Sequence, residues 1–199
     1  MAKYPAIASV GMAILNLLAN ARPNLEFDNA KFELYQSSNF ESPMEEGISL
    51  YLYRVAINGT IRNPASRIGP NGKRQRPPLP LDVHFMLTAW ARTAEKQERL
   101  LGWAMQQLED MPILPSGLLN SVGPEPEVFH PDETVEIIWD PMSVQDMISL
   151  WEHLKSSKTK MQISVTYVAR LLMIDSSLER MEHPAVQTRI FGVGQQVNP

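Results

Sequence analysis

The chain has 199 residues, of which 44% are hydrophobic and 20% charged, and its formal net charge at pH 7 is −4. This length suits one domain with a sizeable core. There is no cysteine, which excludes disulfides, thiolate metal sites and cysteine nucleophiles and fits folding in a reducing cytoplasm. The acidic balance argues against nucleic acid as a partner, and no apolar run approaches the roughly 18–20 residues of a membrane span. We expect a single domain over residues 1–199 with neither partner.

The first predicted element is an amphipathic helix over residues 6–20, closed by Arg22-Pro23. Its apolar positions share one helical face: Ile7, Val10, Ile14, Leu17 and Leu18. Lys3, the apolar stretch and the Ala-Asn-Ala run at 19–21 also resemble a signal peptide. We favour the helix of a mature protein, because the polar residues lie off the apolar face.

Two strands follow this helix. Residues 31–35 form a short candidate with Phe32 and Leu34 on one side, and the polar, acidic residues 37–46 predict a loop. Residues 47–58 alternate strongly. Strict alternation places Ile48, Leu50 and Leu52 on one face, and Tyr51, Tyr53, Val55 and Ile57 on the other.

Residues 58–80 form a long, turn-rich and basic loop that contains no aspartate or glutamate. Its basic residues are the candidate contact residues of the chain: Arg62, Arg67, Lys73, Arg74 and Arg76. One interpretation is a solvated loop. Another is a basic arm that reaches an acidic neighbour through Arg–carboxylate pairs. Nucleic acid is a third, weaker reading, because aromatic residues are not interleaved with these charges.

The strand predicted at residues 81–91 is the centre of the sheet. Pro77, Pro78 and Pro80 stiffen its entry, and we expect them to stay outside a central ladder. One face of the strand is purely apolar and the other is mixed, which predicts at least partial cover on both sides. A helix over residues 93–111 follows, with Thr93 as its N-cap and Pro112 as its end.

The last third alternates irregular and regular segments. Residues 111–131 predict a surface loop, 134–139 a short strand, 143–155 a helix and 162–174 a long strand. Ser143 and Asp146 imitate a capping box, and the spacing of Trp151 favours a core position over a recognition role. From about residue 177 we expect a flexible tail. Its apolar run at 190–193 predicts either a loose end or a strand donated to a neighbouring subunit.

No catalytic or metal-binding pattern emerges from the sequence. The four histidines lack the spacing of a helical zinc site, and no nucleophile elbow, Walker loop or dinucleotide fingerprint is present. His84 lies on the mixed face of its strand and is best interpreted as a hydrogen-bonded core or interface residue. We therefore expect a non-enzymatic protein without cofactor or metal.

The central stretch resembles a family of cap proteins, the tail terminators of phage-tail-like contractile injection systems of the antifeeding-prophage and virulence-cassette type. The resemblance lies in the Pro-Leu entry at 78–81, Asp82, the LTAW sequence at 87–90, and the helix that ends at Pro112. The strand ISLYLYR at 48–54 followed by Arg62-Asn63, and the segments at 143–154 and 164–175, also match. The resemblance covers roughly residues 6–176, and its motifs are structural.

The resemblance implies a tail-terminator-like α+β fold, with a mainly antiparallel or mixed sheet of about four to five strands and about three packed helices. It implies a homohexameric ring that ends the tube, the sheath or both and stops polymerisation, with tube and sheath proteins as partners. Such a protein would assemble in the bacterial cytoplasm and then remain in the particle. The alternative is a non-catalytic module that binds a small molecule or a peptide.

Overall fold

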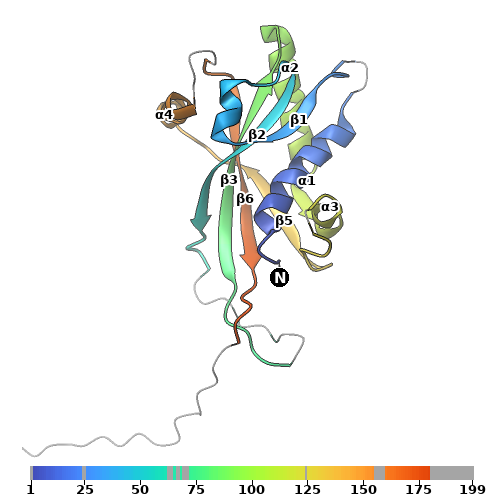
Figure 1. The fold of residues 1–199 in the computed structure, drawn as a ribbon, viewed down its shortest axis with the longest axis vertical. Helices are drawn as coiled ribbons and strands as arrows, with labels where there is room; N and C mark the ends of the chain where they lie inside the picture. Colours follow the sequence, from blue (N-terminus) through green and yellow to red (C-terminus); the bar gives the residue numbers. More distant parts are fainter. Residues whose placement is uncertain are drawn as a thin grey trace, which may run out of the picture.

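The computed structural model describes residues 2–23, 26–61, 65, 68, 72–123, 125–154 and 160–179. The chain adopts an α+β fold (Figure 1). Its helices are α1 (Ala6–Ala21), the 3-10 helix η1 (Ser37–Glu41), α2 (Ala94–Asp110), α3 (Ser116–Ser121) and α4 (Val144–Leu154). Its strands are β1 (Lys31–Tyr35), β2 (Gly47–Ile57), β3 (Leu79–Trp90), β4 (Ile113–Pro115), β5 (Thr134–Trp139) and β6 (Ser164–Ile174).

All strands of the described residues belong to one sheet, with the order β1-β2-β3-β6-β5-β4. The β1–β2 pair is parallel and the other pairs are antiparallel. Residues 47–57 pair antiparallel with residues 81–90, and the two later predicted strands, β5 and β6, extend the same sheet. Within the described residues the sheet has six strands, so the expected four to five is too low, and there are four α-helices instead of the expected three.

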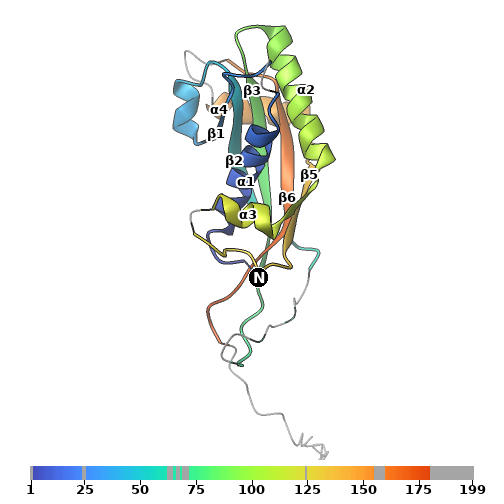
Figure 2. The same cartoon turned by 90° about the vertical axis from the view of Figure 1, so that its right-hand side faces the viewer.

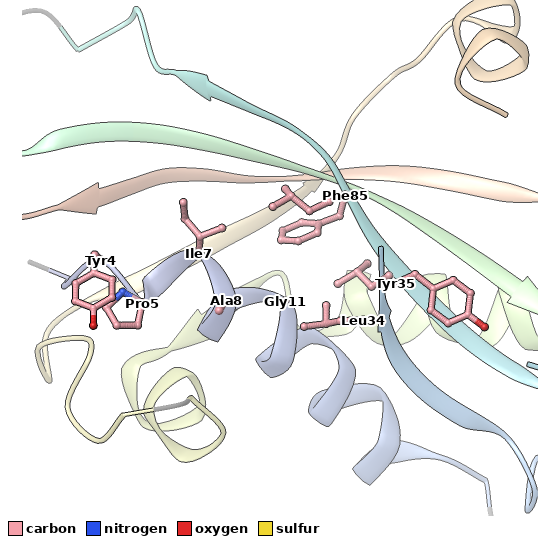
Figure 3. Close-up of a pocket in the computed structure, with 10 residues that line it drawn as sticks. Tyr4, Pro5, Ile7, Ala8, Gly11, Leu34, Tyr35 and Phe85 are labelled. Carbon is pink, nitrogen blue, oxygen red and sulfur yellow. The ribbon is translucent and has the colours of Figure 1, made fainter. Parts of the chain in front are cut away.

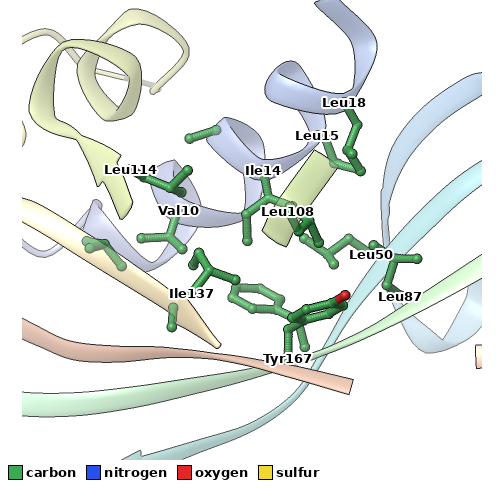
Figure 4. Packing of buried hydrophobic residues seen from close by; sticks show 14 of the residues in the cluster. Val10, Ile14, Leu15, Leu18, Leu50, Leu87, Leu108, Leu114, Ile137 and Tyr167 are labelled. Carbon is green, nitrogen blue, oxygen red and sulfur yellow. The ribbon is translucent and has the colours of Figure 1, made fainter. Parts of the chain in front are cut away.

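Helices α1, α2 and α3 cover one face of the sheet (Figure 2). Their apolar residues meet the alternating apolar residues of the strands in a large, mainly aliphatic core (Figure 4). Val10, Ile14 and Leu18 of α1 and Leu50 and Leu87 of the sheet are all buried in this core. The amphipathic helix expected at residues 6–20 is therefore a core element.

The opposite face carries a smaller cluster under η1 and α4. It consists of buried Tyr35, Phe40, Met86, Trp90, Trp151 and Leu154. Phe40 is its centre, because its ring contacts Tyr35, Tyr51 and Trp151 at centroid distances of 5.3, 5.5 and 5.4 Å in edge-to-face geometry. Both faces of β3 are thus covered, as its pattern predicts, and Trp151 is a core residue.

Two predicted helix starts are confirmed at atomic detail. Thr93 accepts a hydrogen bond from the Lys96 backbone N–H at 3.3 Å and caps α2. The Ser143 Oγ accepts from the Asp146 backbone N–H at 3.1 Å and donates to the Asp146 carboxylate at 2.6 Å. These bonds satisfy N–H groups that have no partner inside the helix.

Three predictions of irregular structure are wrong. Residues 111–131 are not only a surface loop, because they contain β4 and α3, whose Leu114 and Leu119 are fully buried in the large core. The loop at 37–46 contains η1, which anchors Phe40 in the aromatic cluster. Finally, β3 begins at Leu79, so that Pro80 stands in the ladder opposite Met173. The proline fits there because it lies at the very start of the strand.

Candidate interaction surfaces

A β-bulge in β2 changes which residues share a face. Leu52 is opposite Phe85 and Arg54 is opposite His84, so Tyr53 is an extra residue in β2. Beyond the bulge, Val55 pairs with Val83 and Ile57 with Leu81. Opposite residues of an antiparallel pair point to the same face. The sequence-based placement of Val55 and Ile57 opposite to Leu52 is therefore wrong: both lie on the face that α1 covers.

The same half of β2 is an open edge. Its neighbour β1 pairs only with residues Gly47 to Tyr51, and no strand of the described residues pairs with the outer side of β2 beyond that point. Val55 and Ile57 are 44% and 70% exposed there, although Val83 and Leu81 beside them are buried. An unpaired strand edge with exposed apolar side chains is a site at which another strand can add.

An apolar groove of about 490 Å³ adjoins this open edge (Figure 3). It runs along the N-terminal half of α1, from Tyr4 and Pro5 to the end of β1 at Leu34 and Tyr35. Leu50, Leu52 and Phe85 complete it on the sheet side. At Gly11 a Cβ atom would come within 2.9 Å of the Leu34 Cδ2, so the glycine lets α1 approach β1 closely.

A two-stranded projection, which we call the stem, extends from the sheet at the ends of β3 and β6 (Figure 1). It consists of residues 72–78 and 175–179. The Arg76 N–H donates to the Leu178 carbonyl at 3.0 Å, Gln75 pairs with Glu179, and the Lys73 ammonium lies 2.8 Å from the Glu179 carboxylate. The base of the stem is tied to the N-terminus, because the Asp175 N–H donates to the Ala2 carbonyl at 2.9 Å.

The stem carries part of the predicted basic contact set. Lys73, Arg74 and Arg76 are exposed there, and Arg74 and Arg76 make no ion pair with the described residues. Arg62 and Arg67 lie outside the described residues. The apolar run at 190–193 also lies outside them, so the structure does not test the two interpretations of that run. The sequence predicted the basic charges of this loop, but it gave no sign that residues 72–78 pair with residues 175–179.

A polar cluster on the α4 side of the sheet links three distant segments. The Asp140 Oδ2 lies 2.7 Å from the His84 Nδ1 and accepts a 2.7 Å hydrogen bond from the Tyr53 hydroxyl. The bulge brings the extra residue Tyr53 to this position. Burial alone would raise the pKa of Asp140, but the hydrogen bonds from His84 and Tyr53 outweigh it and lower that pKa. Burial, and then the bond to Asp140, raises the pKa of Tyr53.

This arrangement confirms that His84 is a hydrogen-bonded histidine. The Asp140 backbone is also fixed, since its N–H donates to the Thr166 carbonyl at 2.9 Å and its carbonyl accepts from the Thr166 hydroxyl at 2.6 Å. The cluster therefore fixes the position of the end of β5, just before α4 begins. In the described part of the chain, no group of three or more His, Cys, Asp or Glu side chains could hold a metal ion.

A second bulge locks the register of β3 against β6. Arg170 and Leu171 together face Asp82, and Leu171 adopts a left-handed conformation with φ of 56°. The Asp82 carboxylate accepts from the Leu171 N–H at 3.1 Å and from the Asn58 side-chain amide at 2.8 and 3.0 Å. Such a conformation costs about 1–2 kcal/mol for a non-glycine residue, which these bonds help to offset.

A family model described as the Pvc16 N-terminal domain matches residues 9–188. A search of curated proteins found no match. None of the helices in the part of the chain that the structure describes has the length and apolarity needed to cross a membrane.

Two solved structures have a similar fold. One is the sheath/tube terminator, in its extended state, of the PVC extracellular contractile injection system: it is 14% identical, with a TM-score of 0.58 over 96% of this chain and 64% of that chain. The other is the tube-terminating cap of the anti-feeding prophage: it is 12% identical, with a TM-score of 0.57 over 92% of this chain and 60% of that chain. The chain therefore spans less than two thirds of the length of either protein.

Proposed function

Since the chain belongs to the family of Pvc16 N-terminal domains, we propose that it is a structural cap that terminates the tube, the sheath or both of a contractile injection particle. The family match over residues 9–188 carries this proposal. The shared fold with two terminator caps supports it, since both of those proteins end such assemblies. The segments quoted above for the resemblance lie mainly on β2, β3, α2, α4 and β6, the framework of this fold, whereas Arg62 and Asn63 lie outside the described residues.

In this proposal the cap binds the surface to which the next subunit would add, and it does not present the same surface on its own outer side. An open stack of identical subunits presents a sticky face to the next subunit. A homohexameric ring of this chain would match a six-fold tube end and leave no site for further addition. Residues 1–199 act as one cap domain in this proposal.

The proposed role is non-enzymatic. The His84–Asp140–Tyr53 cluster has the polar groups of an acid–base site, but its bonds are all explained by the attachment of β5 to β3 and β2. Assembly in the bacterial cytoplasm, followed by incorporation in the particle, completes the proposal.

In this proposal the stem contacts the tube or sheath subunits to which the cap docks. Arg74 and Arg76 are exposed on a paired segment, from which they can make charge-assisted bonds to carboxylates. Serine at both positions is expected to weaken docking to tube or sheath and to leave the fold intact. Lys73 is kept in this variant because its ion pair with Glu179 stabilises the stem itself.

The experiment is electron microscopy of particles from the host strain with and without the gene. Capped tubes of uniform length should become irregular or lose their sheath on deletion, and the wild-type gene on a plasmid should restore them. Unchanged particles in the deletion strain would overturn the proposal. A protein that stays monomeric, fails to join co-expressed tube subunits and gains thermal stability from a small ligand would favour the binding-module alternative.

A further inference from the structure

We propose that the open edge of β2 receives a strand from a second copy of this chain, and that this strand is the apolar segment at residues 189–193. The inference rests on the proposed ring, since it names the contact that joins neighbouring subunits. It assigns a partner to the groove between α1 and β1 and to the exposed residues Val55 and Ile57.

The unpaired backbone of β2 indicates that the occupant of this edge is an extended strand. Beyond Tyr51 the outer side of β2 has no strand partner among the described residues, so its peptide groups are available to a neighbour. Peptide N–H and C=O groups of an edge are satisfied best by another extended backbone. An added strand would continue the line of β1, which ends at Tyr35.

The side chains beside this edge require the added strand to be apolar. The groove is lined by Leu34, Leu50, Leu52 and Phe85, and Val55 and Ile57 extend the same face beyond it. A strand beside β2 would direct every second side chain toward this surface. Covering it removes apolar area from water, which is the main favourable term in such association.

The chain itself contains one segment of this type beyond its described part. Residues 189–193 read RIFGV, with Phe191 and Val193 two residues apart and therefore on one face of a strand. The described C-terminal segment ends at Glu179, which pairs with Gln75 in the stem, and the stem projects away from the sheet (Figure 1). Residues 180–188 can span about 30 Å when extended. A segment that leaves from the tip of a projection is well placed to reach an adjacent copy.

Disulfide trapping tests this pairing directly, because the 199-residue chain has no cysteine of its own. One set of variants carries Val55→Cys or Ile57→Cys, and the other carries Ile190→Cys, Phe191→Cys or Val193→Cys. The two sets are purified separately, mixed in every pairing and oxidised mildly. Disulfides form only when the Cα atoms come within about 7 Å. Glu98→Cys, on the exposed side of α2, replaces the β2 variant in a matched control.

The expected result is a mixed dimer on a non-reducing gel for at least one pairing of the two sets, at ten-fold or greater yield over the Glu98→Cys control. Phe191→Ser, added to the Ile190→Cys or the Val193→Cys variant, should reduce that yield several-fold. Light scattering of the uncrosslinked protein runs in parallel. Oligomers without a mixed dimer in any pairing would overturn the strand donation and leave the proposed cap untouched.

Two other outcomes distinguish strand pairing within one chain from pairing between copies, and the strand contact from the cap function. A chain that carries both Val55→Cys and Val193→Cys and closes only onto itself, with no mixed dimers, would show that the segment folds back on its own groove and would overturn the inference. Mixed dimers in a protein whose deletion leaves the particles unchanged would confirm the strand contact and overturn the cap function.

Discussion

The two faces of the sheet are stabilised in different ways. The face under α1, α2 and α3 buries a broad, mainly aliphatic core. The face under η1 and α4 combines a small aromatic cluster with specific hydrogen bonds, among them Trp90 to Ser49 and the His84–Asp140–Tyr53 group. The first face supplies most of the apolar burial, and the second fixes the positions of segments far apart in the chain.

This difference predicts that substitutions on the two faces fail for different reasons. On the aliphatic face the loss should follow the volume of the cavity that is created. On the polar–aromatic face it should follow the number of buried groups that lose a hydrogen-bond partner.

The largest effect is expected for Leu87→Ala. Leu87 is fully buried in the aliphatic core, where β3 lies in the middle of the sheet. A buried Leu→Ala change costs about 2–5 kcal/mol because of lost transfer energy and the cavity that remains. Urea denaturation monitored by tryptophan fluorescence would measure it. A loss below about 1 kcal/mol would show that the core can collapse onto the site and that the face is loosely packed.

A matched pair of tryptophan substitutions sharpens the comparison on the second face. Trp90 and Trp151 are 5% and 1% exposed, but only the Trp90 indole N–H has a partner among the described residues, the buried Ser49 hydroxyl at 2.8 Å. Trp90→Phe leaves that hydroxyl unsatisfied and should cost about 1–3 kcal/mol through the lost hydrogen bond.

Trp151→Phe should cost clearly less than Trp90→Phe, since its indole N–H is already without a partner there. The measurement is the difference in the free energy of unfolding between the two variants in the same urea series. Equal losses would mean that ring volume, not hydrogen bonding, governs this face as well.

Asp140→Asn tests the polar cluster through pH. The hydrogen bonds from His84 and Tyr53 lower the pKa of Asp140, so the folded state favours the ionised carboxylate. The stability that this contributes is present above the ordinary pKa of an aspartate, about 4, and is lost as the pH falls through the lowered folded value. The variant should lose about 1–2 kcal/mol at pH 7.

The pH profile gives this test its control. Wild-type stability should fall below about pH 4, and the Asp140→Asn variant should lose less over that range. Asp132→Asn removes an exposed carboxylate instead and should keep the wild-type profile. Parallel profiles for wild type and Asp140→Asn would show that the cluster does not contribute to acid sensitivity.

The smallest effect is expected for Ile57→Ser. Ile57 shares the face of the aliphatic core but is 70% exposed, so the change should alter monomer stability by no more than about 0.5 kcal/mol. Its thermal midpoint in dilute solution should equal that of wild type. A large loss would mean that the residue is buried by a contact within the chain.

The sequence predicted the elements that have a strong period. α1, α2, α4 and the long strands follow from apolar spacing and from caps such as Thr93, because these signals are local. β4 and α3 could not be found, since a strand of 3 residues between prolines and a helix of 6 residues show no readable period. Their burial depends on contacts with α1, which only the folded chain provides.

The interaction surfaces were harder to predict. Nothing in the sequence from Tyr51 to Ile57 reveals the bulge that turns Val55 and Ile57 to the other face. The pairing of His84 with Asp140, 56 residues apart, also depends on strand order. The charges of residues 58–80 were visible, but their support by residues 175–179 was not.

The continuity of the stem with β3 and β6 has a mechanical consequence. A pull along the stem is transmitted along the axes of these two strands, which lie between β2 and β5. Ladder bonds run perpendicular to the strands, so such a load strains many of them together instead of opening them one by one. The bulge at Leu171 opposes slippage of β6 along β3. The sheet is thus built to withstand a shearing load applied along the stem.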